Sequence, residues 1–340
     1  MSTSVKIKKV TLKSVAEAAG VSVPTASQIL NNKANNYCSK EKKRLVRQVA
    51  HELNYQPNFG YQLIHGQKTN TIGIICSSKS AIQQEHIKNL LLNLMTEFEK
   101  LGYAIYTSVM INSEKENIKK ISSLINRGCS AFVLLGHPLG GSKMEKIFIR
   151  NNIDYVTYGL ATTKRIITDS SYAIKCYIDD LMQDGRDNFK IITTLSFDDQ
   201  FSRMNGLMKA FPELNTEQLV QNYVIPIDLD IQQENETIED IFKIGYDKTK
   251  EIIEKDANIQ GIIYHSDYFA LGGARYLSEK GYKIGEDIKI YGYNNVKTVR
   301  LAPYPINTAF HDIEKACEVI TDKLSQPGQF NIILNPQVII

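Results

Sequence analysis

The sequence predicts an all-α helix-turn-helix module followed by an α/β body of two lobes with parallel sheets. Three observations support this fold class. Apolar residues in roughly the first 55 positions recur at spacings of three and four, as in short amphipathic helices. From residue 71 onward, short apolar runs alternate with longer helical stretches, which is typical of parallel sheets covered on both faces. The length of 340 residues also exceeds what one minimal core needs.

The first two expected helices are joined by a tight turn. The stretch LKSVAEAAG, residues 12–20, has helix-forming composition and ends at Gly20, which can adopt the positive φ of a helix stop. Ser22 is placed to cap the next helix. Pro24 falls in the first turn of that helix, where its missing N–H has no intrahelical partner to lose. Two short helices that face each other through alanines indicate a helix-turn-helix.

A third helix is expected after the polar loop NNKANNYC. Ser39 is its predicted N-cap. Its predicted apolar stripe comprises Leu45, Val46, Val49, Ala50 and Leu53. The three helices would enclose one small core in a module of about 55 residues.

The charges are unevenly distributed along the chain. The net charge is only +3, but the first 70 residues hold eleven lysines and arginines against three glutamates, a net charge of +8. The remaining 270 residues carry 29 basic and 34 acidic side chains. A basic module on a mildly acidic body favours contact between the module and a polyanion, with a solvated charged face as the alternative.

The composition predicts a cytoplasmic protein without membrane contact. No apolar run approaches the roughly 18–20 residues of a membrane span, and the start MSTSVKIKKV lacks the apolar core of a signal peptide. The cysteines are odd in number and form no C-x-x-C pair, which argues against a disulfide framework and a zinc site. They are Cys38, Cys76, Cys129, Cys176 and Cys317.

The N-terminal part contains a specific combination of motifs. These are V-T-L-K-x-V-A-x-x-A-G-V-S-V from Val10, T-x-S-x-x-L-N from Thr25 and E-L-N-Y-x-P-N from Glu52. With them, residues 10–73 resemble the DNA-binding head and hinge of the lactose-repressor (LacI/GalR) family of bacterial transcription regulators. The resemblance implies three domains: a helix-turn-helix DNA-binding domain at 1–56, a hinge helix and linker at 57–70, and a two-lobe effector-binding and dimerisation domain at 71–340.

The resemblance also implies which residues contact operator DNA. In the family the second helix lies in the major groove, and a short hinge helix enters the minor groove. The positions that would lie on or beside bases and phosphates are Ser22, Val23, Pro24, Thr25, Ser27, Gln28 and Asn31. Those that would contact mainly the DNA backbone are Thr11, Ser39, Lys42, Tyr55 and Asn58.

Gln28 departs from the family pattern, which usually has arginine at this position. Arginine in the major groove prefers guanine, whereas glutamine pairs bidentately with adenine, and each good pair is worth about 1–3 kcal/mol against the wrong base. We therefore expect A·T character in the operator at the position that Gln28 reads, with Val23 against a thymine methyl.

The hinge is expected to fold only on DNA. Pro57 ends the preceding helix, Asn58 can cap a new one, and Gly66 can stop it. About eight residues cannot hold a helix in water, so the segment would form on the operator beside its twin from a second subunit. Ile64 falls where the family places an apolar wedge between base pairs of the minor groove, with Leu63 as the alternative.

The body is predicted to consist of two consecutive series of strands and helices. The strands expected in the first series are at 71–76, 103–109, 130–136 and 154–159, with helices at 85–101, 114–127 and 142–151. The second series has strands at 189–195, 223–227, 261–265 and 288–293, with helices near 172–184, 200–211, 237–255, 268–280 and 312–325. Two such series predict two Rossmann-like lobes, whose ligands bind beyond the carboxyl ends of the strands.

The resemblance extends more weakly over the body, which is similar to type I periplasmic sugar-binding proteins that hold a ligand between the lobes. It implies that Arg203, Ser266, Asp267 and Asn294 bind the effector. Arg203 would grip effector hydroxyls, with an ordinary salt-bridged helix arginine as the alternative. Asn294 stands where an acidic residue is usual, and Gly159 where some sugar-binding relatives carry aspartate. Both departures weaken the case for a familiar sugar, because carboxylates accept hydrogen bonds from hydroxyls.

These features predict a homodimeric repressor of carbohydrate-utilisation genes that reads a pseudo-palindromic operator. A small-molecule effector, expected to be a sugar or sugar derivative, would change the angle between the lobes, separate the hinges and lower operator affinity. Co-repression, in which the effector raises operator affinity, is the alternative.

An enzyme or a solute-binding protein on the same two-lobe fold is the competing class. GHPLGGSK, residues 136–143, lacks the G-K-[ST] order of a phosphate loop, and no G-x-G-x-x-G opens a helix. The six histidines are scattered, among them His86 and His265, which are more often structural than catalytic. We therefore expect no catalytic residues, no metal and no cofactor. The missing signal peptide and the basic head argue against a periplasmic sugar binder.

Overall fold

The computed structural model describes residues 10–30, 38–55, 69–195, 200–227 and 237–340. The chain divides into two compact units, Met1–Thr69 and Asn70–Ile340. Each unit has buried apolar clusters of its own, so each is described by itself.

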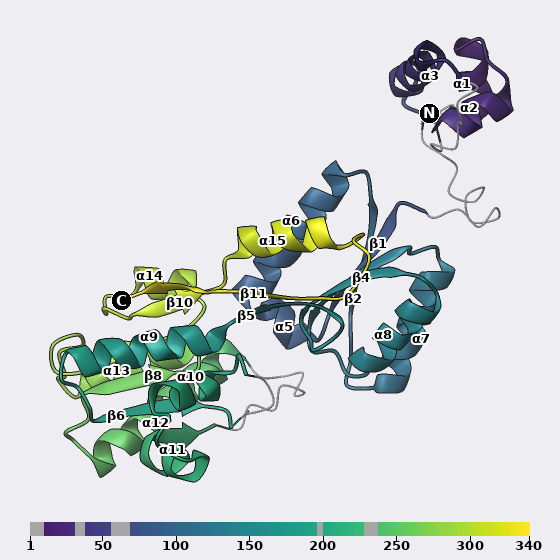
Figure 1. The fold of residues 1–340 in the computed structure, drawn as a ribbon. Coiled ribbons are helices and arrows are strands. Elements are labelled where there is room, and N and C mark those ends of the chain that lie inside the picture. Colours follow the sequence, from purple (N-terminus) through teal and green to yellow (C-terminus); the bar gives the residue numbers. More distant parts are fainter. Residues whose placement is uncertain (1–9, 31–37, 56–68, 196–199, 228–236) are drawn as a thin grey trace, which may run out of the picture. The chain divides into compact units, whose positions relative to one another are not determined.

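Three helices form the first unit: α1 (Leu12–Ala18), α2 (Val23–Leu30) and α3 (Lys40–Glu52) (Figure 1). Gly20 joins α1 to α2 with a φ of +62°, the left-handed conformation that glycine adopts without steric cost. The buried core of the unit consists of small and branched side chains: Val15, Ala16, Ala19, Ala26, Ile29, Val46 and Ala50. The predicted helix-turn-helix with a third supporting helix is therefore confirmed.

The predicted apolar stripe of α3 is wrong at one position. Leu45 is 45% exposed, whereas Val46 and Ala50 are buried. The side chains that pack on the core follow the spacing i, i+3, i+4, i+7 from Val46, with Val49 and Leu53 partly buried. Leu45 lies about 100° from Val46 around the helix, so it points away from that core.

A six-stranded sheet in the order β11-β5-β4-β3-β1-β2 forms the first lobe of the second unit. Its strands are β1 (Thr71–Cys76), β2 (Ala104–Val109), β3 (Ala131–Gly136), β4 (Asp154–Gly159), β5 (Lys164–Thr168) and β11 (Phe330–Leu334). All these pairings are parallel. β1 is buried along its whole length, as expected of a central strand in a parallel sheet with both faces covered.

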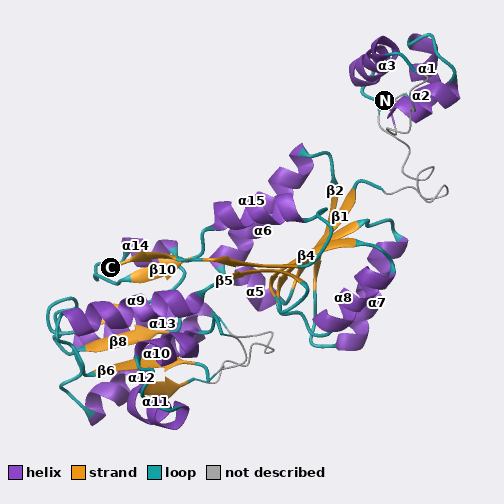
Figure 2. Ribbon diagram, in the orientation of Figure 1, coloured by secondary structure: helices purple, strands orange, loops and turns teal. Residues whose placement is uncertain are grey.

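Helices cover both faces of this sheet (Figures 1 and 2). α6 (Glu85–Lys100) and α15 (Ile313–Lys323) pack side by side over one face, with the short α5 (Lys79–Gln83) against them. α7 (Glu114–Asn126) and α8 (Gly141–Arg150) cover the opposite face. Successive residues of β1 therefore enter two different apolar clusters.

A four-stranded parallel sheet in the order β7-β6-β8-β9 forms the second lobe. Its strands are β6 (Phe189–Thr193), β7 (Val224–Pro226), β8 (Gly261–Tyr264) and β9 (Lys289–Tyr291). One face packs on α9 (Ser170–Gln183), α10 (Arg203–Ala210) and α11 (Thr216–Tyr223). The other packs on α12 (Ile238–Lys255) and α13 (Asp267–Glu279). The predicted two-lobe α/β body is confirmed.

The chain passes between the lobes three times, which corrects the expectation of two consecutive series. It leaves the first sheet after β5, returns to it with α15 and β11, and leaves again for β12 (Gln337–Ile339). β12 pairs antiparallel with β10 (Thr308–Phe310) and packs against the second lobe. The helix expected at 312–325 therefore packs on α6 in the first lobe.

Several short helices and strands of the structure are not predicted from the sequence pattern. They are α5, α11, α14 (Lys297–Leu301), β5, β10, β11 and β12. β11 alternates between half-buried and exposed residues, like a strand at the edge of a sheet, and thus lacks the continuous apolar run that marks β1 or β3. Strands and helices of three to eight residues carry too few positions for a period to show.

The backbones of α12 and α13 approach each other at glycines. A Cβ at Gly272 would stand 2.0 Å from the carbonyl oxygen of Phe242, and one at Gly245 would stand 2.1 Å from the carbonyl oxygen of Phe269. Neither position has room for a side chain, so the close packing of this helix pair depends on glycine at both.

Candidate functional site

The first turn of α2 is held by its own side chains. The Oγ of Ser22 accepts the backbone N–H of Thr25 at 3.3 Å, and the two hydroxyls lie 2.8 Å apart. Pro24, which has no N–H to donate, occupies this turn. α2 thus begins directly after Ser22, the residue predicted to cap it.

The outer face of α2 carries small polar and apolar side chains. Ala26 and Ile29 point into the core of the unit. The predicted DNA contacts lie away from these two: Ser22, Val23, Pro24 and Gln28 are exposed, and Thr25 and Ser27 are half-buried. α2 contains no acidic residue, so this face offers hydroxyls, an amide and methyl groups. These are groups that contact bases and phosphates in a major groove.

Two further predicted DNA contacts are helix caps. Thr11 and Ser14 form a capping box at the start of α1, and the Oγ of Ser39 accepts the N–H of Lys42 at 3.2 Å at the start of α3. Helix N-termini present backbone N–H groups and partial positive charge, which favour phosphate. Tyr55 is half-buried against the core of the unit.

Basic side chains gather on α3, where Lys40, Lys42 and Arg44 are exposed. They give the unit a positive surface that favours a polyanion. The remaining predicted DNA contacts, Asn31, Asn58 and Ile64, lie outside the described residues, as does most of the predicted hinge.

In the second unit, polar side chains from both lobes meet at the carboxyl ends of parallel strands. Two of them lie in the first turns of helices, His86 in α6 and Arg203 in α10. The others lie at or just after the carboxyl ends of strands: Tyr158, Thr168, Thr193, His265, Tyr293 and His311. We name these residues the interlobe cluster. Parallel strands end at one edge of a sheet, so residues far apart in sequence come together there.

Arg203 has no hydrogen-bond or ion-pair partner among the residues that the structure describes. Its Nε is buried and unpaired, and its guanidinium lies over the ring of Tyr293, 4.6 Å from the ring centroid. Burial lowers the pKa of Arg203, yet a guanidinium stays charged in proteins. The described residues therefore do not support the alternative of an ordinary salt-bridged arginine.

His86 and His311 connect the two lobes through a ring stack, with centroids 4.4 Å apart and planes 16° apart. The Tyr158 hydroxyl lies 3.0 Å from the Nδ1 of His311 and 2.9 Å from the hydroxyl of Thr168. The Nδ1 of His86 is buried and has no hydrogen-bond partner. A buried polar atom without a partner is rare in native proteins and commonly marks the place of a water or a ligand.

Burial and the charge of Arg203 keep the histidines of the cluster neutral. The pKa of His86 falls from 6.5 to about 4, because burial disfavours the charged ring and Arg203 repels a second cation. The pKa values of His265 and His311 lie well below the ordinary value for the same reasons. At neutral pH the cluster offers neutral imidazoles beside one fixed cation.

Asp267, predicted as an effector contact, is engaged within the protein. Its buried carboxylate accepts the Thr308 hydroxyl at 2.7 Å and the N–H of Val296 at 2.8 Å. Burial raises the pKa of Asp267 to about 6, against the opposing effect of these hydrogen bonds. Asp267 thereby ties the start of α13 to β10 and to the segment after β9. Its contact with an effector stays a prediction.

Ser266 and Asn294 lie beside this tie. Ser266 is the half-buried N-cap residue of α13. Asn294 has a φ of +100°, and its N–H donates to the carbonyl oxygen of Ala309 at 2.6 Å. The next residue, Asn295, has a buried Oδ1 without a partner. Ser266 and Asn294 each directly follow a member of the interlobe cluster in the chain, His265 and Tyr293 respectively, and their contact with an effector stays a prediction.

Sequence reasoning identifies Arg203 but misses the residues around it. His86 and His265 are judged there as scattered histidines, and Tyr158, Tyr293 and His311 are not singled out. The only available signal is positional: His265 directly follows β8, and His311 directly follows β10. That signal needs strand boundaries, and β10 is too short to be predicted.

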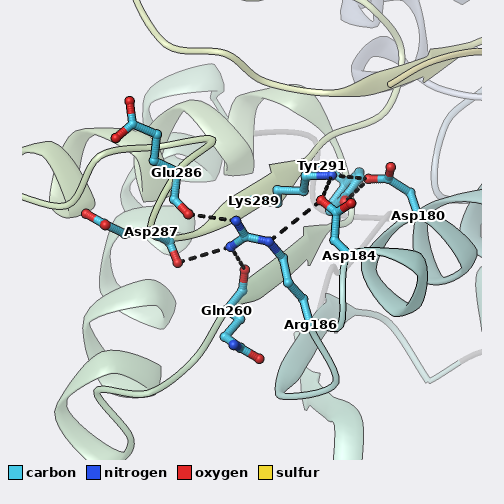
Figure 3. Close-up of polar contacts among 8 residues, drawn as sticks. All are labelled: Asp180, Asp184, Arg186, Gln260, Glu286, Asp287, Lys289 and Tyr291. Carbon is cyan, nitrogen blue, oxygen red and sulfur yellow. Dashed lines mark hydrogen bonds and ion pairs between the residues drawn. The ribbon is translucent and has the colours of Figure 1, made fainter.

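The opposite edge of the second sheet contrasts with the cluster. Figure 3 shows a network there in which Arg186 donates to the backbone carbonyls of Gln260, Glu286 and Asp287, and the side chains of Asp180, Asp184, Lys289 and Tyr291 pair with one another. Lys289, the first residue of β9, lies 3.0 Å from Asp180 and also pairs with Asp184, whose pKa it lowers. The charged groups of this network hold elements together, whereas Arg203 at the carboxyl edge has no such partner among the described residues.

Metal-ligand clusters and membrane-spanning helices are both absent from the described part of the chain. No group of histidine, cysteine and acidic side chains there is arranged to hold a metal ion. Within the same ranges, none of the helices combines the length and apolar character that crossing a bilayer needs.

Two family models match the chain. Residues 11–58 match the bacterial regulatory proteins of the lacI family, and residues 178–326 match a periplasmic binding protein-like domain. The first match contains all three helices of the first unit, and the second contains the four-stranded sheet of the second lobe.

Similar curated proteins align over most of their length. The HTH-type transcriptional repressor PurR of Pasteurella multocida is 22% identical over 97% of each chain. The HTH-type transcriptional regulator AscG of Escherichia coli is 20% identical over 87% of this chain and 84% of its own. Both names denote transcription regulators and not enzymes.

Solved structures share the fold. The Lac repressor dimer bound to operator and the anti-inducer ONPF matches with a TM-score of 0.72 at 20% identity, over 98% of both chains. The complex of the transcriptional regulator CelR with cellobiose matches with a TM-score of 0.63 at 18% identity, over 98% of this chain and 99% of the other.

Proposed function

Since the chain is a member of the lacI family of bacterial regulatory proteins, a DNA-binding class of transcription regulator, we propose that it is a sequence-specific repressor controlled by a small-molecule effector. The observation that carries this proposal is the exposed face of α2, which offers hydrogen-bonding and methyl groups and no acidic group that would repel DNA. We assign it no catalytic activity and place its action in the cytoplasm.

Three parts of the chain divide the work in this proposal. Residues 1–56 bind DNA, with Gln28 and Val23 reading bases while Thr11, Ser39 and Lys42 hold phosphates. Residues 57–70 form the hinge, with Ile64 in the minor groove. Residues 71–340 bind the effector and a second copy of the chain. A two-fold dimer places two heads on one operator, so the operator is a pseudo-palindrome.

The interlobe cluster is the proposed effector site. It joins residues of both lobes, as the His86–His311 stack illustrates, and His311 lies where the chain crosses from one lobe to the other. A ligand there makes different contacts when the lobes rotate. Only such differential binding can drive a switch, either releasing the operator or, as a co-repressor, tightening its binding.

A sugar or sugar derivative is the effector class that the resemblance favours, with carbohydrate-utilisation genes as targets. The structurally similar CelR holds cellobiose, which supports this class. A purine is the second candidate, because several relatives carry the name PurR.

A surface on α14 supports the proposed homodimer. Leu301 is 85% exposed, and it borders a hollow of about 440 Å³ that is lined by apolar Phe242, Leu271 and Pro303 and by basic Arg275 and Lys297, among others. A large apolar side chain beside a partly apolar hollow fits a self-complementary two-fold contact, in which each copy covers the other's Leu301.

The proposal is tested by selecting binding sites from random duplexes with the full chain and with Gln28→Arg. We expect a two-fold symmetric consensus, with A·T at one position of each half-site that becomes G·C for the variant. The matched control is Gln48→Arg, which adds the same charge to an exposed position of α3 and should leave the consensus unchanged.

Two results contradict the proposal in different ways. A chain that selects no sequence at low salt, with or without candidate metabolites, is not a sequence-specific repressor. If the consensus is identical for the wild type and Gln28→Arg, Gln28 does not take part in base recognition.

A further inference from the structure

The interlobe cluster holds a positive charge that the described residues do not neutralise. Arg203 is surrounded by neutral histidines and tyrosines. In the described part of the chain, the carboxylates that act on those tyrosines are engaged elsewhere: Asp169 caps α9, Asp312 caps α15, and Asp267 ties α13 to β10. An unpaired charge away from water is costly, so a ligand of opposite charge is favoured there.

The N–H groups of the Arg203 guanidinium keep their hydrogen-bond capacity. The Cζ of Arg203 lies 4.6 Å from the centroid of the Tyr293 ring, and its N–H groups, including the buried Nε, have no partners among the described residues. The edge of a guanidinium matches two oxygens of a carboxylate or a phosphate. The unpaired Nδ1 of His86 adds a second donor when it carries the proton.

Carboxylates that could accept from hydroxyl groups are few. Asn294 carries an amide, Gly159 has no side chain, and the carboxylate of Asp267 is engaged by Thr308 and Val296. Each hydroxyl of a neutral polyol both donates and accepts, and an ionised carboxylate is its strongest acceptor. Among the described residues, this site offers a cation and an imidazole but no free carboxylate.

We propose that the effector is a small organic anion whose carboxylate or phosphate group pairs with Arg203 and accepts a hydrogen bond from His86. This inference rests on the proposed function, because it takes the interlobe cluster as the effector site. Within the sugar class it selects sugar acids and sugar phosphates, and within the purine class it selects nucleotides.

Matched probes test the charge requirement on the full chain. Thermal unfolding is followed with glucose, glucuronate and glucose phosphate, with ribose and ribose phosphate, with inosine and inosine monophosphate, and with inorganic phosphate alone. We expect at least one organic anion to raise the unfolding midpoint by several degrees when present at about 100 times its Kd, while its neutral parent does not. The carboxylate and phosphate probes distinguish the two sources of charge.

Variants locate the charge. Titration calorimetry of the active anion should show at least about a tenfold loss of affinity in Arg203→Gln and a smaller loss in Arg203→Lys, which keeps the charge but not the planar edge. Arg150→Gln, at an exposed position on α8, is the matched control and should bind like the wild type. An unliganded unfolding midpoint close to that of the wild type, together with retained operator binding, shows that the Arg203 variants are folded.

The inference is overturned if no organic anion shifts the midpoint, if neutral parents bind as well as their anions, or if Arg203→Gln binds the active anion with unchanged affinity. These outcomes are independent of the proposed function, which is measured by operator binding of the same preparation. A chain that binds the anion through Arg203 but never binds DNA would refute the repressor and retain the anion site.

Discussion

At the scale of single residues, the number of hydrogen-bond donors and acceptors left without a partner in the fold distinguishes residues for which the sequence predicts the same role. The resemblance predicts effector contacts for both Arg203 and Asp267. The structure gives Asp267 two partners, Thr308 and Val296, and leaves the Nε of Arg203 with none among the described residues. The sequence gives the type of each residue, but the hydrogen-bond partners of its side chain come from other elements of the fold.

The depressed pKa of His86 predicts a pH-dependent contribution to stability. The unfolded chain binds a proton at this ring below about pH 6.5 and the folded protein only below about pH 4, so its contribution is present above 6.5 and is lost as the pH falls to 4. We expect His86→Gln to reduce the loss of stability in this window by at most about 3 kcal/mol. The measurement is the urea unfolding midpoint from pH 8 to pH 4.

Asp267 acts with the opposite sign in the same window. Because its folded pKa is about 6 and the ordinary value is 3.8, the folded protein binds the extra proton there and gains stability as the pH falls. The difference between wild type and His86→Gln therefore isolates the histidine. Parallel pH curves for the two proteins would show that His86 titrates in the folded state as it does in the unfolded chain.

At the scale of secondary-structure elements, close backbone approach decides what the sequence pattern leaves open. The periodicity of α12 and α13 predicts two amphipathic helices but not that they touch through glycines. A Cβ at Gly272 meets the backbone of Phe242, which cannot move without displacing α12. Packing also decides which face of α3 is buried: Val46 is buried against the core, whereas Leu45 is exposed.

Gly272→Ala is expected to destabilise the second unit by about 1–3 kcal/mol, because the added methyl group forces α12 and α13 apart. Calorimetric unfolding or urea titration of the full chain measures the change. Ser278→Ala, at an exposed position on the same helix, is the control and should be nearly neutral. A Gly272→Ala protein as stable as the wild type would contradict the close packing of this helix pair.

At the scale of the whole molecule, the proposed repressor needs two copies of the chain, since one head reads only half of a symmetric site. The exposed Leu301 beside its partly apolar hollow is the surface that we assign to this association. Burying it against a second copy removes apolar area from water, at about 25 cal/mol per Å².

Leu301→Asp should raise the dissociation constant of the dimer at least tenfold, because a carboxylate would be buried without a partner. Analytical ultracentrifugation over a concentration series measures it, and operator affinity should fall in parallel. Ile149→Asp places the same charge at another exposed apolar position, 57% exposed on α8, and should leave the dimer intact. If Leu301→Asp and Ile149→Asp form dimers of equal stability, the dimer interface does not include Leu301.

Much of the architecture follows from local pattern. The helix-turn-helix is predicted because Gly20, Ser22 and Pro24 act on their own neighbours through φ, capping and a missing N–H. The long strands and helices of the body are predicted because burial on one or two faces imposes a period. The lobe to which α15 and β11 belong is not predicted, since crossing between lobes leaves no local mark in the sequence.

The sequence alone therefore determined the class of the molecule: a basic three-helix head with a polar outer face, and an α/β body with a predicted ligand site at Arg203. Only the tertiary structure decided the chemistry of that site. His86 and His311 meet by stacking across two lobes, and Arg203 loses water without gaining a partner among the described residues. The physical reason is that solvation and pairing of a charged group depend on what the whole fold brings within a few ångströms of it, and a linear chain does not encode those distances locally.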